Sequence, residues 1–161
     1  MKKQIELIVL AMLFLAFNAC QSSSKSTQED KVEEKSINSK GETIAFKTAK
    51  NYFINNTVKE AVPVKITTQE EFDKYFGKAA TMGENGKPTP IDFSKEYVIV
   101  VNNPDTNKKT DITPISLEKI AKDLVFQYSI KEGEDVGFTM HPFLMIVVEK
   151  SIEGNVVLQK N

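Results

Sequence analysis

The chain contains one histidine and one cysteine, which leaves few arrangements for catalysis. A Ser-His-Asp or Cys-His arrangement can use only His141, and Cys20 is the only thiol. A single thiol also excludes an internal disulfide framework and any zinc or iron-sulfur site with several thiolate ligands. His141 stands directly before Pro142, at the start of an apolar run. A lone histidine of this kind is typically structural or solvated; a pH sensor or a weak metal ligand are the alternatives.

Acidic residues are numerous, but their positions explain most of them without chemistry. The acids at 70–71 lie at the start of a predicted helix, and those at 132–135 lie in a turn-forming segment. Asp105 and Asp111 flank a loop but lack the Asp-x-Asp-x-Asp-Gly spacing of a calcium loop. A hydrolase with two carboxylates facing one cleft stays open, with Asp92 as its candidate, although a turn or capping role explains that residue more simply. We therefore predict no catalytic residue, no metal and no cofactor.

The N-terminal segment has the three parts of an export signal. Lys2 and Lys3 form a positive start, residues 7–17 are apolar, and Phe17-Asn18-Ala19-Cys20 ends in a small residue followed by cysteine. The apolar run is shorter than the roughly 20 residues needed to span a bilayer. The pattern resembles the lipobox of bacterial lipoproteins, in which Leu and a small residue are commoner at the first two of these four positions.

The lipobox resemblance implies lipidation at Cys20: diacylglycerol on the thiol, cleavage before Cys20, and a fatty acyl chain such as palmitate on the new amino terminus. Two or three acyl chains, at about 0.8 kcal/mol per buried methylene, make such an anchor effectively permanent. We therefore expect residues 1–19 to be a lipoprotein signal peptide. The mature protein is expected to be exported and anchored in the cell envelope, at the outer membrane. A simple secretory signal and an uncleaved anchor are the alternatives.

Residues 20–41 form the lipidated cysteine and a flexible tether in this scheme. Val32 and Ile37 are the only aliphatic residues of the segment 21–40, and none of its residues is aromatic. Such a segment buries too little apolar surface to offset the entropy of ordering it. A coil of this length reaches on the order of 25 Å, enough to hold a domain clear of lipid head groups. We place a single folded β-rich domain at 42–161.

Charge excludes one class of partner. The 21 basic residues are all lysines and stand against 22 acidic residues. No guanidinium is present to clamp a phosphate in a bidentate manner. Nucleic-acid binders usually show a clustered basic face, so we expect no nucleic-acid partner.

Alternation of apolar and polar residues predicts β-strands in the first part of this domain. Strands are expected around Ile44 and Phe46 and at 51–54. A third is expected at 62–66, where Pro63 suits a sheet edge because proline cannot donate to a strand ladder.

A short helix follows the third of these strands. Thr68 and Glu71 fit a capping box, and Gly77 is expected to end the helix. Its apolar stripe consists of Phe72, Tyr75 and Phe76. The segment from Lys78 to Pro90 is broken by glycines and prolines and is expected to be a loop.

The strongest strand signal is Tyr97 to Val101, which is apolar at every position. We expect it at the centre of a sheet with both faces covered. Turn-forming residues follow at 102–107. Strands are then expected at 110–118 and 124–130, with the segment from Glu132 to Asp135 turning the chain.

The last part of the chain predicts one further pair of strands. Phe143 to Glu149 is mostly apolar, 151–155 is expected to be a tight turn, and 156–158 to return as the last strand. The predicted fold class is α+β, mostly β: an antiparallel sheet of about six or seven strands with one short helix near its start.

The order of these elements resembles the C-terminal domain of PrcB-type protease-complex lipoproteins. The resemblance covers Ile66 to Lys150 and is carried by the segments ITTQEEFDKYFG, IDFSKEYVIVV and FTMHPFLMIVVEK. It implies a non-enzymatic accessory lipoprotein associated with a protease, and it supplies no catalytic residues. The segment PDTNKKTDITP stands where that family usually has a Gly-rich hairpin, so the resemblance does not fix the partner.

These observations favour a protein-binding module over an enzyme. Its partner is expected to be a protease that it accompanies or inhibits. An immunity or structural envelope protein that binds a toxin or envelope component is the first alternative, and the hydrolase is the second. Loops on a rigid sheet concentrate binding residues, so contacts are expected at 78–90, 102–109 and 132–137. The candidate contact residues are Asn102, Asn103, Asp105, Lys108, Glu134 and Asp135.

Overall fold

The computed structural model describes residues 41–79, 82 and 86–161. The predicted signal peptide, the lipidation of Cys20 and nearly all of the tether lie outside the described residues and stay predictions, as do the domain limits. Part of the predicted loop at 78–90 also lies outside them. No helix in the described part is long and apolar enough to cross a membrane.

Two apolar strands of seven residues form the centre of the first sheet. β6 (Glu96–Asn102) and β9 (Phe143–Glu149) pair antiparallel over their whole length. β2 (Lys47–Ala49) lies beside β9 and β4 (Lys65–Ile66) beside β6, which gives the order β2-β9-β6-β4. The prediction of an edge strand around Pro63 is confirmed for its last two residues.

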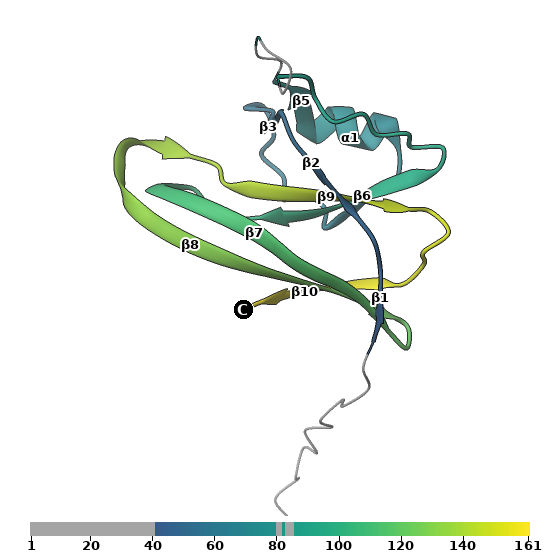
Figure 1. Ribbon diagram of the computed structural model, residues 1–161. Coiled ribbons are helices and arrows are strands. Elements are labelled where there is room, and N and C mark those ends of the chain that lie inside the picture. Colours follow the sequence, from purple (N-terminus) through teal and green to yellow (C-terminus); the bar gives the residue numbers. More distant parts are fainter. Residues whose placement is uncertain (1–40, 80–81, 83–85) are drawn as a thin grey trace, which may run out of the picture. The chain divides into compact units, whose positions relative to one another are not determined.

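A second sheet is built on a long hairpin. β7 (Thr106–Ile120) and β8 (Asp123–Met140) pair antiparallel, with β1 (Glu42–Thr43) beside β7 and β10 (Asn155–Lys160) beside β8. This sheet faces one side of the β6–β9 pair, and the helix lies on the other side (Figure 1).

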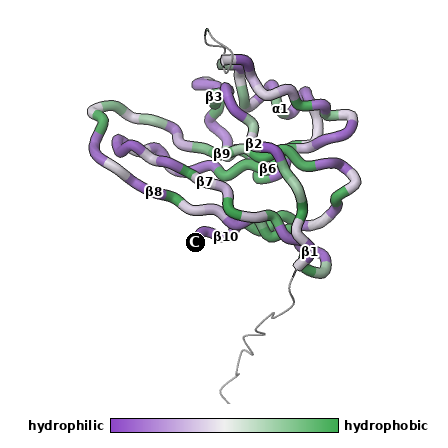
Figure 2. Tube along the Cα trace, viewed as in Figure 1, coloured by the Kyte–Doolittle hydropathy of each residue, from purple (hydrophilic) through white to green (hydrophobic). Residues whose placement is uncertain are grey.

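Side chains of β6 and β9 point alternately into two apolar clusters, as predicted for a central strand. From Tyr97 to Val101 no residue is more than 2% exposed. Odd positions of β6 meet Leu117, Leu124 and Phe126 of the second sheet, while even positions meet Phe72, Tyr75 and Phe76. The hydrophobic colour along β6 and β9 in Figure 2 reflects this two-sided burial.

The helix begins as its sequence predicts. α1 (Gln69–Tyr75) is capped by Thr68, whose side chain accepts a hydrogen bond from the Glu71 backbone N–H at 3.2 Å. Phe72 and Tyr75 are buried, which confirms the apolar stripe. The acidic residues of the first turn favour the positive end of the helix dipole.

The end of the helix differs from the prediction. Phe76 is already extended, and its N–H donates to the Phe72 carbonyl, so Gly77 does not end the helix. Gly77 lies in β5 (Phe76–Lys78), which pairs with β3 (Tyr52–Ile54) as a separate two-stranded sheet. A Cβ atom at position 77 would come within 2.3 Å of the Phe53 ring, so glycine is needed here for a close approach.

The fold class, α+β and mostly β, is confirmed, but the strand number and arrangement differ. Ten strands form two four-stranded sheets and one two-stranded sheet in the described part, instead of six or seven strands in one sheet. The strands predicted at 51–54 and 62–66 correspond to β3 and β4, whereas β5 was not predicted. The prediction of a strand around Ile44 and Phe46 is wrong, because these residues link β1 to β2, which belong to different sheets. The strands β1 to β5 have only two or three residues each. Runs this short show too little alternation to be counted from sequence.

The prediction that the last strand returns beside its predecessor is wrong. β10 crosses to the second sheet and pairs parallel with β8. The crossing is tight: a Cβ atom on Gly154 would lie 2.8 Å from Leu124 Cγ and 3.0 Å from the Lys122 carbonyl oxygen. Tyr97 fixes the same crossing by donating its hydroxyl to the Ile152 carbonyl at 2.9 Å.

Tyr97 generates a pH-dependent prediction. Burial raises the pKa of Tyr97 from the ordinary 10.0 to about 12. Because the folded state disfavours the phenolate, this contribution to stability is complete below pH 10 and is lost as the pH rises from about 10 to about 12. We expect Tyr97→Phe to lower the free energy of unfolding by about 1 kcal/mol at pH 8, through loss of the Ile152 hydrogen bond.

The measurement is urea unfolding of both proteins from pH 8 upward. The difference between wild type and Tyr97→Phe should shrink, then reverse sign, as the pH passes 10, while lysine titration affects both proteins alike. A difference that stays constant up to pH 11.5 would contradict the assignment.

Candidate functional site

The far end of the β7–β8 hairpin brings several predicted contact residues together. We call residues 103–109 and 132–141 the bulged end. The prediction that Glu132 to Asp135 turns the chain is wrong, because these residues continue β8. The predicted turn at 102–107 is shorter than expected: Asn102 ends β6, and β7 begins at Thr106. Lys108 is therefore a strand residue, not a loop residue.

An irregular register creates the bulge. Thr106 pairs with Met140, but Lys108, two residues further along β7, pairs with Asp135. The additional residues of β8 have no partner on β7 and arch away from it. Gly137, at φ 75°, supplies the left-handed backbone that this arch requires.

Asp135 holds the bulge in place from both sides. Its Oδ1 accepts the Gly137 backbone N–H at 2.7 Å, and its Oδ2 accepts a hydrogen bond from the Asn107 side-chain amide. The first bond closes a local turn and the second ties β8 to β7. The Asp135 carboxylate therefore orders the bulged part of β8, in which no residue from 132 to 140 is buried.

Phe138 is presented by this ordered arch. Its side chain is 62% exposed, the largest value among the large apolar residues of β7, β8 and their neighbouring strands. A single exposed apolar side chain is ordinary, but this ring directly follows Gly137, whose backbone N–H is held by Asp135.

Charged residues of both signs lie on the strands and links of the bulged end. Lys108 forms an ion pair with Glu132 at 3.0 Å, and His141 pairs with Asp105. All four side chains are about half exposed, so each pair contributes at most about 1 kcal/mol. Glu134 is exposed and forms no ion pair or side-chain hydrogen bond with the described residues.

The Asp105–His141 pair lies where the chain passes between the sheets. Asp105 is on the link from β6 to β7, and His141 is on the link from β8 to β9. Asn103 donates its backbone N–H to the Pro142 carbonyl at 3.0 Å, so the two links run side by side. His141 therefore contacts Asp105 across two adjacent links, which is a structural role that needs no catalysis. The same contact and the Asn103 hydrogen bond place Asn103 and Asp105 beside the bulge.

The two candidates for a hydrolytic site do not meet. Asp92 precedes the first residue of β6, whereas His141 lies at the opposite end of that strand. Seven residues at about 3.3 Å each separate these ends by roughly 20 Å. Asp92 accepts hydrogen bonds from the Ser94 hydroxyl at 2.6 Å and backbone N–H at 3.0 Å, which hold its pKa below the ordinary value. It is a turn residue, as its simpler interpretation predicted.

The remaining predicted contact regions lie outside the bulged end. Asn102 lies with His141 on the wall of a small cavity of about 150 Å³ near residues 54–62. The segment 78–90, so far as it is described, lies near α1 and not at the bulged end. No group of three or more His, Cys, Asp or Glu side chains in the described part could hold a metal ion.

Phe138 and Asn107 are not among the contact residues predicted from the sequence. The available signal is an aromatic residue directly after glycine within a polar stretch, KEGEDVGFT. Val136 and Met140 stand at alternate positions to Phe138, a pattern that by itself favours a shared buried face, so the exposure of this ring could not be predicted from the sequence. The hydrogen bond of Asn107 depends on the register of β7 against β8, which the sequence does not show.

Removal of the Asp135 carboxylate should loosen the bulge without unfolding the protein. We expect Asp135→Ala to increase amide hydrogen exchange at 136–139 about tenfold, because a hydrogen bond to a charged group contributes about 1.5 kcal/mol. Glu134→Ala, which removes an adjacent exposed carboxylate, should leave these rates unchanged. Equal effects of the two variants, measured by exchange and mass spectrometry, would show that Asp135 does not order the arch.

Comparison with known proteins assigns no family or function to the chain. No family model, no curated protein and no solved structure matches the chain. The resemblance to PrcB-type lipoproteins therefore stays a prediction.

Proposed function

We propose that this chain is a lipid-anchored envelope protein that binds another protein through the bulged end and catalyses no reaction. The observation that carries the proposal is Phe138, an exposed ring on an arch ordered by Asp135. A side chain whose backbone is already ordered loses little entropy on binding. Aromatic residues of this kind commonly dominate the binding energy of protein interfaces.

The surroundings of Phe138 suit such an interface. Protein interfaces typically combine an apolar centre with a polar, solvent-accessible rim. The Lys108–Glu132 ion pair and the Asp105–His141 contact provide polar, half-exposed groups on both strands and both links of the bulged end. The rim has no strong charge of one sign, so specificity would come from the placement of individual groups.

A catalytic alternative has less support. Among the described residues no polar or charged side chain is buried, and the two candidates for hydrolysis lie at opposite ends of β6. Catalytic groups are commonly shifted in pKa by burial in a cleft, whereas Asp92 is exposed and takes its lowered pKa from Ser94. We propose a protease as the partner, on the resemblance of the sequence; recovery of a toxin would instead support the immunity function.

The binding surface can be tested by photo-crosslinking in the producing cells. With benzoyl-phenylalanine in place of Phe138, we expect a covalent adduct with one protein, identified by mass spectrometry. The same replacement at Val157, which is 43% exposed on β10, is the control. With the purified partner, Phe138→Ala should weaken binding at least tenfold, and Val157→Ala should change it less than twofold. Equal adducts at both positions would refute the surface.

The lipid anchor is tested separately. We expect the mature N-terminal peptide to carry a diacylglyceryl group on Cys20 and the protein to sediment with membranes. Cys20→Ser should remove the lipid mass and prevent cleavage by the lipoprotein signal peptidase, whereas Ser22→Ala should change neither. An unmodified thiol at position 20 of the mature wild-type protein would eliminate the anchor, and it would have no bearing on the bulged-end surface.

A further inference from the structure

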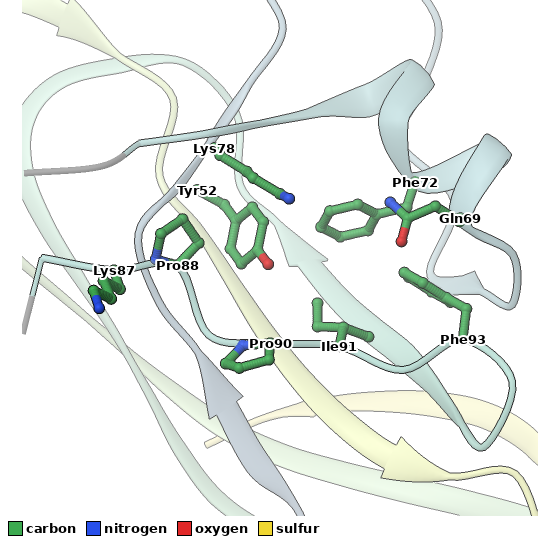
Figure 3. A pocket seen from close by; sticks show the side chains of 9 residues that line it. All are labelled: Tyr52, Gln69, Phe72, Lys78, Lys87, Pro88, Pro90, Ile91 and Phe93. Carbon is green, nitrogen blue, oxygen red and sulfur yellow. The ribbon is translucent and has the colours of Figure 1, made fainter.

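A cavity of about 420 Å³ lies beside α1, away from the bulged end (Figure 3). The rings of Tyr52, Phe72 and Phe93 form one part of its wall. Pro88, Pro90 and Ile91, from the segment leading to β6, form another. Its volume lies in the range of small-ligand sites, and its wall is mostly apolar.

The cavity wall is held by hydrogen bonds outside the regular sheets. Tyr52 donates its hydroxyl to the Thr89 carbonyl at 2.6 Å, and Thr89 exchanges two further bonds with Lys50. Phe72 contacts the Tyr52 ring edge-on at 5.2 Å and the Phe93 ring at 5.4 Å. The prolines on either side of Thr89 restrict its backbone, so the cavity is formed before any ligand arrives.

One positive charge points along this apolar wall. In Figure 3 the Lys78 side chain extends toward the Tyr52 and Phe72 rings, whereas Lys87 points away. None of the described residues lining the cavity is acidic. Lys47, Lys74 and Lys108 each have a carboxylate partner, but Lys78 has no such partner among the described residues.

Gln69 completes the polar part of the wall. Its side-chain amide N–H donates to Asp73 Oδ1 at 2.7 Å, which leaves its carbonyl oxygen as an acceptor. Burial and, second, the negative charge of Asp73 raise the pKa of Tyr52, so this carboxylate acts on the Tyr52 side of the cavity although it does not line it. The Lys78 side chain extends toward the cavity from β5. A ligand that fits both features has an apolar group and an anion very close together.

We propose that this cavity binds the carboxyl-terminal residue of a peptide chain that ends in a large apolar side chain. At a chain end, the carboxylate and the side chain share one Cα atom, so both reach the same cavity. In an internal segment, an acidic residue next to an apolar one projects its side chain to the opposite side of the extended peptide. Charge complementarity with Lys78 and the single apolar compartment both fit the chain end.

The test uses the full chain in detergent micelles and fluorescein-labelled Gly-Ser-Gly-Ser-Leu-Phe, followed by fluorescence anisotropy. We expect the free-carboxylate peptide to bind about fivefold more tightly than its C-terminal amide, the size of a partly exposed ion pair. Lys78→Gln should abolish this difference, and Lys122→Gln, on the β7–β8 turn, should preserve it. Equal binding of carboxylate and amide peptides, or the same effect of both lysine variants, would overturn the proposal.

Two further experiments test where the peptide binds and which ligand the cavity accepts. With benzoyl-phenylalanine as the last peptide residue, the adduct should map to Tyr52, Gln69, Phe72 or Phe93; an adduct confined to other residues overturns the proposal. Free 3-phenylpropanoate should compete at least tenfold more weakly than the peptide; equal competition would assign the cavity to small carboxylic acids instead. Phe138→Ala should leave all these results unchanged, so failure here and failure of the bulged-end function are distinguishable.

Discussion

The fold depends on the burial of the β6–β9 pair on both faces. A strand pair with apolar side chains in both directions cannot lie at a surface, because each exposed face would lose about 1.5 to 3 kcal/mol per large side chain. One face is covered by the second sheet and the other by α1 with the β3–β5 sheet. Both proposed sites lie on the elements that cover these two faces: the bulged end on β7 and β8, and the cavity beside α1.

The two sites differ in what holds them. The cavity beside α1 rests on the aromatic side chains that cover one face of β6–β9, so its shape follows from core packing. The bulged end extends beyond the other cluster and has no buried side chain of its own. Its order depends on polar contacts, chiefly those of Asp135. Polar order of this kind can be removed by one substitution while the core remains.

Local patterns predict the elements whose sequence signal is contained in neighbouring residues. The alternation at 124–130, the uniform burial from Tyr97 to Val101 and the Thr68 cap need no knowledge of distant contacts. The parallel pairing of β10 and the register shift opposite Lys108 depend on residues far apart in the chain. The segment 132–135 has the glycine and acidic residues that favour a turn, but pairing with β7 keeps it extended.

The open edge of β7 is poorly suited to pairing with a strand of a partner protein, so we expect a partner to contact side chains instead. β1 pairs only with Glu118 and Lys119, so most of β7 has an open side. β7 contains Lys108, Lys109 and Pro114, and its pairing with β8 changes register between Thr106 and Thr110 and again between Pro114 and Ser116. Lysine, proline and bulges each hinder the docking of a further strand. We therefore expect a partner to contact the side chain of Phe138 and the charged side chains of the bulged end. Such a contact depends on individual side chains, whereas strand addition depends on the repeating backbone groups of an edge.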